Sequence, residues 1–177
     1  IAEARATPAR RPLFLYLAPN TPHTPYVEAP RHAGSCGDRT FPMPANFNAT
    51  DTVKEPSWMA ASQPASTLAE TIKRRVTCSM LRTLDENVNA VIGELARERR
   101  LANTYVIFTS DNGFALGDRG LADKWFAYEE DIRVPLLIAD LRQPRSRNET
   151  AMALNIDIAP TLLDYAGVAV PAAMQGR

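Results

Sequence analysis

The chain has 177 residues, enough for one domain with a sizeable hydrophobic core. Its 20 basic and 20 acidic side chains cancel, so no overall basic charge is present to attract nucleic acid or an anionic membrane surface. No apolar run approaches the roughly 18 residues that a membrane-spanning helix requires. Composition therefore predicts a globular protein without a membrane span and gives no sign of nucleic-acid binding, although balanced charge by itself leaves a local basic patch open.

The first predicted element is a buried strand over residues 13–18, because these six residues are all apolar. A loop over residues 19–25 follows, and its three prolines exclude both a helix and a central strand. This loop holds His23. We therefore expect His23 to lie on a rigid loop at the edge of a sheet.

Residues 29–64 hold many prolines and show no clear period, which predicts an irregular excursion over the surface. A long helix is expected next, because Thr67 and Glu70 fit a capping box. Apolar residues then recur every three or four positions and form one stripe: Ile72, Val76, Met80, Leu84, Val88, Val91 and Leu95. The charged residues on the opposite face are expected to meet water: Lys73, Arg74, Arg82, Glu86 and Arg97.

The two cysteines, Cys36 and Cys78, lie far apart in the sequence and could be free or paired. Cys78 falls within the helical pattern, which favours a buried side chain that acts as a small apolar group. Two distant cysteines do not show whether the protein works in an oxidising or a reducing compartment.

The most informative segment begins with Tyr105–Thr109, an apolar run that predicts a strand. Asp111 and Asn112 follow it almost directly, and ligands of open α/β sheets bind beyond the carboxyl ends of the strands. A carboxylate with an amide oxygen suits Ca²⁺ or Mg²⁺ far better than zinc. Asp-Asn-Gly is also a common turn, so a turn without a site is the alternative. The glycine-rich loop up to Lys124 has no strand pattern, and a long loop in this position favours a site.

Two elements are predicted after this loop. Residues 134–139 form another apolar run, and a last helix is expected over residues 157–166. Pro160 would lie in the first turn of that helix and Gly167 would end it. The order strand, helix, strand, loop, strand, helix predicts an α/β fold with a partly parallel sheet covered by helices.

Several segments resemble the sulfatases of the alkaline-phosphatase-like superfamily. Residues 109–124, Thr-Ser-Asp-Asn-Gly-Phe-x-Leu-Gly-Asp-x-Gly-Leu-x-x-Lys, carry the closest likeness. Four further segments agree with it in the family's order: residues 15–25, 84–88, 128–136 and 155–163. The resemblance implies an alkaline-phosphatase-like sheet flanked by helices, with residues 1–177 as the C-terminal part of a catalytic domain. The segment that starts at residues 29–32 is most similar to enzymes for N-acetylglucosamine-6-sulfate or heparan-type sugars.

The same resemblance implies roles for four residues. Asp111 and Asn112 would be metal ligands in the loop over residues 109–124, with Ca²⁺ favoured over Mg²⁺. His23 would contact the sulfate and could protonate the leaving oxygen, and Lys124 would bind a sulfate oxygen. The implied function is a calcium-dependent sulfatase, which hydrolyses a sulfate ester of a sugar, a larger glycan or an aryl compound. By the same resemblance we expect a secreted, periplasmic or lysosomal-type compartment.

Two hallmarks of the family are missing. Sulfatases carry Cys-x-Pro-x-Arg or Ser-x-Pro-x-Arg, whose first residue is oxidised to formylglycine, the nucleophile, and an upstream pair of aspartates completes the metal site. Neither Cys36 nor Cys78 has proline two positions later, and the aspartate pair is absent. We therefore expect formylglycine in an upstream segment, and this chain alone to be inactive.

Two other functions stay open. A phosphonate monoester hydrolase or phosphodiesterase of the same superfamily would share the Asp-Asn loop, and a non-catalytic binding domain could keep the fold. Arg119 departs from the His or Phe of many family members, so it could bias substrate choice or face solvent. Three aromatic residues could stack on a sugar or pack in the core: Trp58, Trp125 and Tyr128. Asp118 and Asp123 are expected to be solvated, and structural roles are expected for Glu129, Arg133 and Asp157.

Overall fold

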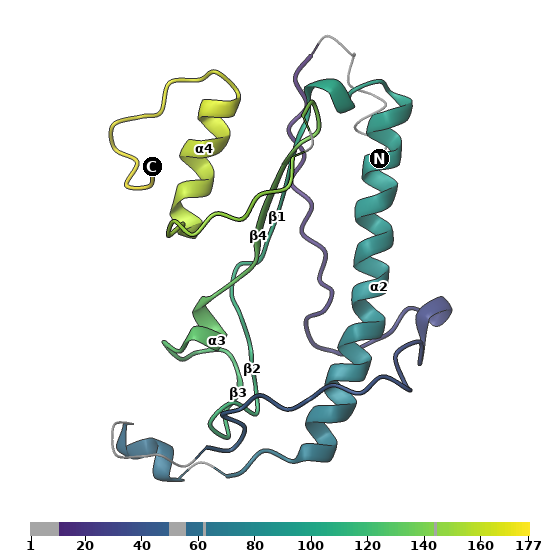
Figure 1. Ribbon diagram of the computed structural model, residues 1–177, viewed down its shortest axis with the longest axis vertical. Coiled ribbons are helices and arrows are strands. Elements are labelled where there is room, and N and C mark those ends of the chain that lie inside the picture. The colour runs from purple at the N-terminus through teal and green to yellow at the C-terminus, as the bar shows by residue number, and fades with distance from the viewer. Residues whose placement is uncertain (1–10, 50–55, 62, 144) are drawn as a thin grey trace. The chain divides into compact units, whose positions relative to one another are not determined.

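The computed structural model describes residues 11–49, 56–61, 63–143 and 145–177 (Figure 1). The chain divides into two compact units, Ile1–Gln143 and Pro144–Arg177. The first unit holds the long helix α2, two small sheets and the short helix α3, and the second holds helix α4. No helix in the described ranges is long and apolar enough to cross a membrane.

Helix α2 runs over Thr67–Arg97, close to the helix expected from the apolar stripe. Its cap is Ser66, whose Oγ accepts a hydrogen bond from the backbone N–H of Ala69 at 3.3 Å. The predicted capping box on Thr67 and Glu70 is therefore wrong by one residue. Glu70 is instead buried and accepts a hydrogen bond from Lys73 Nζ at 2.9 Å. The middle and the end of the stripe are in the core, as the buried Met80 and Leu95 show.

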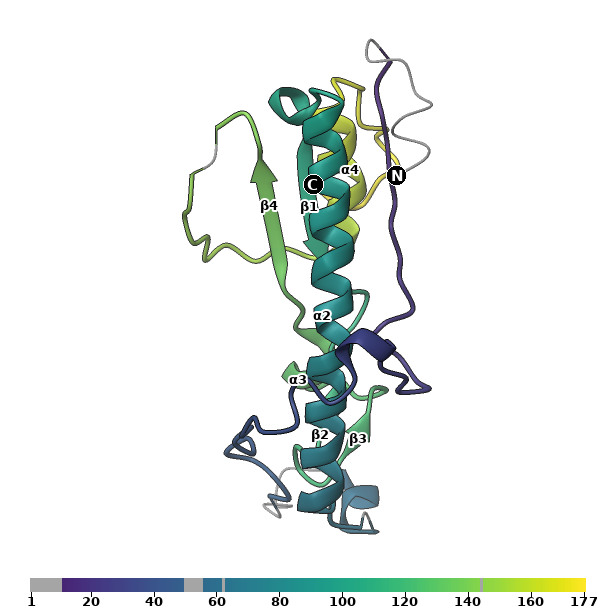
Figure 2. The ribbon, with the colours of Figure 1, turned by 90° about the vertical axis from the view of Figure 1, so that its right-hand side faces the viewer.

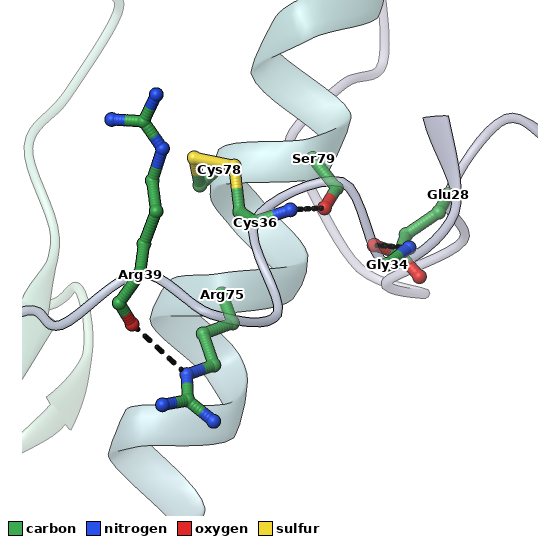
Figure 3. Close-up of a disulfide and its surroundings, with 7 residues drawn as sticks. All are labelled: Glu28, Gly34, Cys36, Arg39, Arg75, Cys78 and Ser79. Carbon is green, nitrogen blue, oxygen red and sulfur yellow. Dashed lines mark hydrogen bonds between the residues drawn. A yellow bond between two sulfur atoms is a disulfide. The ribbon is translucent and has the colours of Figure 1, made fainter. Parts of the chain in front are cut away.

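A disulfide joins Cys36 to Cys78 in the middle of α2 (Figure 3). The short 3₁₀ helix η1, Pro30–His32, precedes Cys36 in the sequence and lies against α2 (Figure 2). Cys36 N–H also donates to Ser79 Oγ at 3.3 Å. The structure thus corrects the expected role of Cys78, which anchors the irregular excursion to the helix rather than acting only as a small apolar side chain.

Strand β1, Tyr105–Thr109, confirms the strand predicted before Asp111. It pairs with β4, Leu136–Asp140, in an antiparallel ladder from Tyr105↔Asp140 to Thr109↔Leu136. The expected parallel pairing is therefore absent from the described part of the chain. A parallel connection needs a long crossover, usually a helix, whereas the only helix between β1 and β4 is α3, the single turn Glu129–Ile132.

Residues 13–18 do not form the predicted strand. They pair with no strand among the described residues, and the Tyr16 side chain is 81% exposed. The prediction failed because apolar character favours burial, but strand structure also needs a neighbour that accepts and donates the backbone hydrogen bonds.

The loop after Asn112 contains a small hairpin that the sequence did not reveal. Strand β2, Ala115–Leu116, pairs with β3, Ala122–Asp123, in an antiparallel ladder. Gly117 and Gly120 lie in the turn with φ of 89° and 74°. Strands of two residues are too short to show an alternating pattern. A small core supports the hairpin: Met59, Ala115 and Leu121, with Phe126 and Tyr128 packed against them.

The second unit confirms the predicted C-terminal helix. Helix α4 runs over Ile158–Tyr165, after the 3₁₀ turn η4 over Asn155–Asp157. Pro160 lies in its first turn, and Gly167, at φ 68°, follows its end. The carboxylate of Asp157 accepts backbone hydrogen bonds from Leu154 and Arg177, which supports the structural role expected for it.

Candidate functional site

The end of β1 presents two oxygen-bearing side chains. Asp111 Oδ1 accepts hydrogen bonds from Asn112 N–H at 3.0 Å and from Ser110 Oγ at 3.4 Å. Asn112 Nδ2 donates to the Gly113 carbonyl at 2.6 Å, and its Oδ1 accepts a hydrogen bond from Lys124 Nζ at 3.1 Å. The structure thus places Lys124 directly beside Asn112, twelve positions earlier in the chain, with Asp111 next to it.

Helix α3 holds both ends of this loop. The backbone N–H groups of Gly113 and Phe114 each donate at 2.7 Å, to the carbonyls of Asp131 and Glu130. A Cβ at position 113 would lie 2.1 Å from the Glu130 carbonyl oxygen, so only glycine permits this approach. At the other end, Oδ2 of the buried Asp131 accepts hydrogen bonds from the backbone N–H groups of residues 125 and 126, directly after Lys124.

The turn of the hairpin is held by an ion pair between Arg119 and Glu130. Arg119 Nη1 lies 3.1 Å from each carboxylate oxygen of Glu130, and its guanidinium stacks 4.5 Å above the Tyr128 ring. Asn46 Nδ2 donates to Glu130 Oε1 at 2.7 Å, and Arg119 N–H donates to the Asn46 carbonyl at 2.8 Å. We call this group, Asn46, Arg119, Tyr128 and Glu130, the clamp.

The clamp lowers the pKa of Glu130. Partial burial acts to raise the pKa of Glu130, but hydrogen bonds from its own backbone, from Asn46 and from Arg119 outweigh burial and hold the pKa below its ordinary value. Arg119 is therefore committed to Glu130 and Tyr128 in this structure, rather than free in solvent. Sequence reasoning missed Asn46 because the excursion has no period, and it did not single out Glu130 within the acidic run of residues 129–131.

Helix α2 also supports the loop through side chains that we expected to meet water. Arg74 Nη2 donates to the Leu116 carbonyl at 3.0 Å, and Lys73 Nζ lies 5.8 Å from the centroid of the Phe114 ring. Asp118 is buried rather than solvated, and its Oδ2 accepts a hydrogen bond from Leu116 N–H at 2.9 Å. These three residues were wrongly expected to be solvated. Arg74 and Asp118 bond to backbone groups of the loop, and Lys73 lies near the Phe114 ring and the Glu70 carboxylate.

His23 is exposed, and its described contacts stay within its own loop. Its backbone N–H donates to the Asn20 carbonyl, and its Nδ1 lies 2.9 Å from the Thr24 carbonyl oxygen. The structure gives no contact that joins His23 to Asn112 or Lys124 within the described residues. Its participation in a common site stays a prediction.

The aromatic candidates differ in their surroundings. Trp58 stacks on Phe126 with ring centroids 5.2 Å apart, and Tyr128 lies under Arg119. Trp125, which follows Lys124 directly, is 86% exposed. Of the three residues that could stack on a sugar, Trp125 is the one whose ring lies most open to a ligand.

Asp111 and Asn112 fit one part of a site for a hard divalent cation. Their side-chain oxygens are the donor type that Ca²⁺ takes, and Asp111 is exposed. Ca²⁺ takes six to eight oxygen ligands, and the described residues contain no group of three His, Cys, Asp or Glu side chains that could hold a metal. The two residues can therefore supply only part of a complete ligand shell.

Comparison with known proteins places the chain in a family. Residues 1–168 match the sulfatase family model, so the chain belongs to the sulfatase family, whose members are sulfuric ester hydrolases. An N-acetylglucosamine-6-O-sulfatase from Bacteroides thetaiotaomicron is 43% identical over 97 residues, which cover 52% of this chain and 17% of the relative. Human N-acetylglucosamine-6-sulfatase is 32% identical over 162 residues, which cover 88% of this chain and 29% of the relative.

A solved structure shares the fold. A protein in complex with its substrate, D-glucosamine-2-N,6-O-disulfate, superposes on this chain with a TM-score of 0.68 and 27% identity. The superposition covers 88% of this chain and 44% of that protein. The fold is therefore the α/β, alkaline-phosphatase-like fold of sulfatases. The chain spans less than a third of the length of the two curated relatives and less than half of the solved one.

Proposed function

We propose that this chain forms part of the catalytic domain of a sulfatase that hydrolyses a sulfate ester on a glucosamine-type sugar. One observation carries the proposal: Lys124 Nζ lies 3.1 Å from Asn112 Oδ1, beside Asp111, on a loop held by the clamp. This arrangement combines a cation with two oxygen donors at the carboxyl end of a strand, where α/β enzymes bind ligands. The relatives named as N-acetylglucosamine-6-sulfatases support the sugar.

The chemistry of the reaction explains these residue types. Cleavage of a sulfate ester requires stabilisation of charge on the sulfuryl oxygens and on the leaving oxygen. A divalent cation held in part by Asp111 and Asn112 would supply charge neutralisation. Lys124 binds a sulfuryl oxygen as a compact point charge, once its ammonium turns from the Asn112 amide to the ester. His23 donates a proton from its imidazole ring to the leaving oxygen as a general acid.

The nucleophile belongs to another part of the full-length protein in this proposal. Cys36 and Cys78 are joined in the disulfide, so neither thiol is available for oxidation to formylglycine. The same disulfide supports a secreted, periplasmic or lysosomal-type location, because such bonds persist in oxidising compartments.

Hydrolysis of glucosamine 6-sulfate by the full-length gene product tests the proposal. Lys124→Ala should lower kcat/KM by on the order of 100-fold, as expected for loss of a charged group that stabilises the transition state. Arg147→Ala removes a cation that is largely exposed in the second unit and serves as the matched control, with unchanged kinetics expected. A less than threefold effect of Lys124→Ala would reject its role. Faster turnover of phosphate or phosphonate esters would favour the related hydrolases, and no turnover of either ester would favour a binding domain.

A further inference from the structure

A pocket of about 470 Å³ lies beside the disulfide, outside the loop of residues 110–124. The excursion supplies one wall and α2 the other. Its charged lining consists of His32, Arg39, Arg82, Asp85 and Glu86. Cys78 and Leu81 complete the wall on α2. Neither the roles implied for the four candidate residues nor the clamp uses this pocket.

One of the two carboxylates that line the pocket, Glu86, is already paired with cationic or hydrogen-bonding side chains. Glu86 accepts hydrogen bonds from Arg31, with Nη2 at 2.7 Å, and its Oε1 lies 2.8 Å from His32 Nε2. The hydrogen bond from Arg31 is the main cause that holds the pKa of Glu86 below its ordinary value. Glu86 is thus a poor ligand for a further cation, and Asp85 is the one carboxylate of the lining without such a partner among the described contacts.

The two remaining cations are available to a ligand. Arg39 and Arg82 are both exposed, and neither side chain has an ion pair within the described part of the chain. In Figure 3 the guanidinium of Arg39 points in the opposite direction from that of Arg75, alongside the disulfide. A guanidinium binds the oxygens of a sulfate or carboxylate through two parallel hydrogen bonds, so two free guanidinium groups in one pocket suit an oxyanion.

The wall that carries Arg39 is fixed before any ligand arrives. Three residues upstream, Cys36 is held by the disulfide and by its hydrogen bond to Ser79. The Arg39 carbonyl itself accepts a hydrogen bond from Arg75 Nε at 3.1 Å. Because the backbone of this wall is anchored to α2, which forms the other wall, binding there orders few additional groups, and its entropic cost is lower.

Helix α2 connects this pocket to the candidate active site. Arg74 holds the loop through the Leu116 carbonyl, and the helical period places Leu81 and Asp85 on the same face as Arg74. The eight-residue step from Arg74 to Arg82 rises about 12 Å along the helix axis. A ligand that reached both places would have to be an oligosaccharide rather than a single sugar.

We propose that the pocket around Arg39 and Arg82 binds an acidic group of a sulfated oligosaccharide, on a sugar other than the one whose ester is hydrolysed. The proposal deepens the proposed function, because it takes the sulfated-glycan substrate class from it. Its own content, recognition of an oxyanion by Arg39 and Arg82, does not depend on catalysis.

Binding and hydrolysis by the full-length gene product test it separately. The probe is a size-defined, heparin-type sulfated tetrasaccharide, titrated calorimetrically at fixed ionic strength. Arg39→Ala with Arg82→Ala should weaken binding on the order of tenfold or more, since two charge-assisted contacts are lost. KM for the tetrasaccharide should rise with kcat unchanged, and kinetics on a small aryl sulfate should not change. Arg145→Ala with Arg147→Ala removes equal charge in the second unit and should leave binding unchanged.

Each outcome bears on one proposal. Unchanged tetrasaccharide binding in the Arg39, Arg82 double variant overturns the pocket, as does equal binding by the wild type of a tetrasaccharide that is both desulfated and carboxyl-reduced. Arg39→Lys with Arg82→Lys should recover only part of the affinity, and full recovery would reject paired hydrogen bonding. If the wild type hydrolyses no sulfate ester but still binds the tetrasaccharide through Arg39 and Arg82, the proposed function fails and the pocket stands.

Discussion

Residues 110–124 and residues 13–23 both carry groups assigned to chemistry by family resemblance, but the chain holds them in different ways. The first segment is tied to α3 through Gly113, to α2 through Arg74, and to the excursion through Asn46. The second is a largely exposed segment without a strand partner among the described residues, where the contacts of His23 stay within its own loop. The loop is thus held by polar contacts, backbone hydrogen bonds and a small apolar core made inside the chain, whereas an apolar strand also requires a sheet neighbour.

Removal of the disulfide should cause the largest loss of stability, because the bond anchors the stretch of chain between the two segments. It closes a separation of 42 residues, for which the chain-entropy model gives about 4 kcal/mol of stabilisation. Cys36→Ser with Cys78→Ser should lower the free energy of unfolding by about this amount, measured by urea titration. A loss below about 1 kcal/mol would show that other contacts already hold the excursion on α2.

Gly113→Ala should cause the second largest loss of stability, and it acts on residues 110–124. The new Cβ would meet the backbone carbonyl of Glu130, which cannot move without displacing α3. We expect destabilisation of about 1–3 kcal/mol, as for other overpacked sites. Hydrogen exchange of the amides of residues 113 and 114 should become faster. Gly93→Ala in α2 is the matched control, because the added Cβ would meet no described atom within 4 Å apart from its chain neighbours and the backbone of its own helix. This variant should be neutral or slightly stabilising.

The ion pair between Arg119 and Glu130 should contribute more to the free energy of unfolding than the pair between Arg133 and Glu129, which also involves a glutamate of α3. Its side chains are 28% and 22% exposed, whereas Arg133 and Glu129 are 82% and 72% exposed and 3.7 Å apart. Arg119→Ala should therefore cost about 1 kcal/mol, and Arg133→Ala less than about 0.5 kcal/mol. Equal losses in urea titrations of the two variants would show that the clamp is only a surface ion pair.

The stabilisation that Glu130 contributes should depend on pH, which gives a second test of the ion pair with Arg119. Its folded pKa lies below the ordinary value of 4.5, so the unfolded chain binds the proton more readily. The stabilisation from Glu130 is then complete above pH 4.5 and is lost as the pH falls through the folded pKa. The difference in unfolding free energy between wild type and Glu130→Gln should shrink in this acidic range. A difference that stays constant from pH 6 down to pH 3 would exclude the ionised clamp.

The smallest effect is expected in the less constrained segment. Tyr16 is largely exposed in this structure, so Tyr16→Ser should change the unfolding free energy of the 177-residue chain by less than about 0.5 kcal/mol. Thermal unfolding of the two chains is a sufficient measurement. A loss above 1 kcal/mol would show that residues 13–18 pack against other parts of the chain in solution.

Local patterns predicted the elements whose signal lies within one segment. The apolar run at residues 105–109 and the period along α2 correspond to β1 and to the helix, and Pro160 with Gly167 mark the last helix. Asp111 and Asn112 could also be recognised as candidates, because they follow the predicted strand within one contiguous segment. The partners of β1 and of Cys36 could not be predicted, because pairing across a long connection produces no pattern in the neighbouring residues.

The amino-acid sequence by itself determined helices α2 and α4, the strand before Asp111 and membership of the sulfatase family, since periodicity and a contiguous motif are local properties. Only the tertiary structure decided that Lys124 lies against Asn112 and that Arg119 is committed to Glu130. It also decided that Cys36 and Cys78 form a bond. Such contacts depend on how the backbone turns between distant residues, and that path follows from the balance of packing and hydrogen bonding over the whole fold.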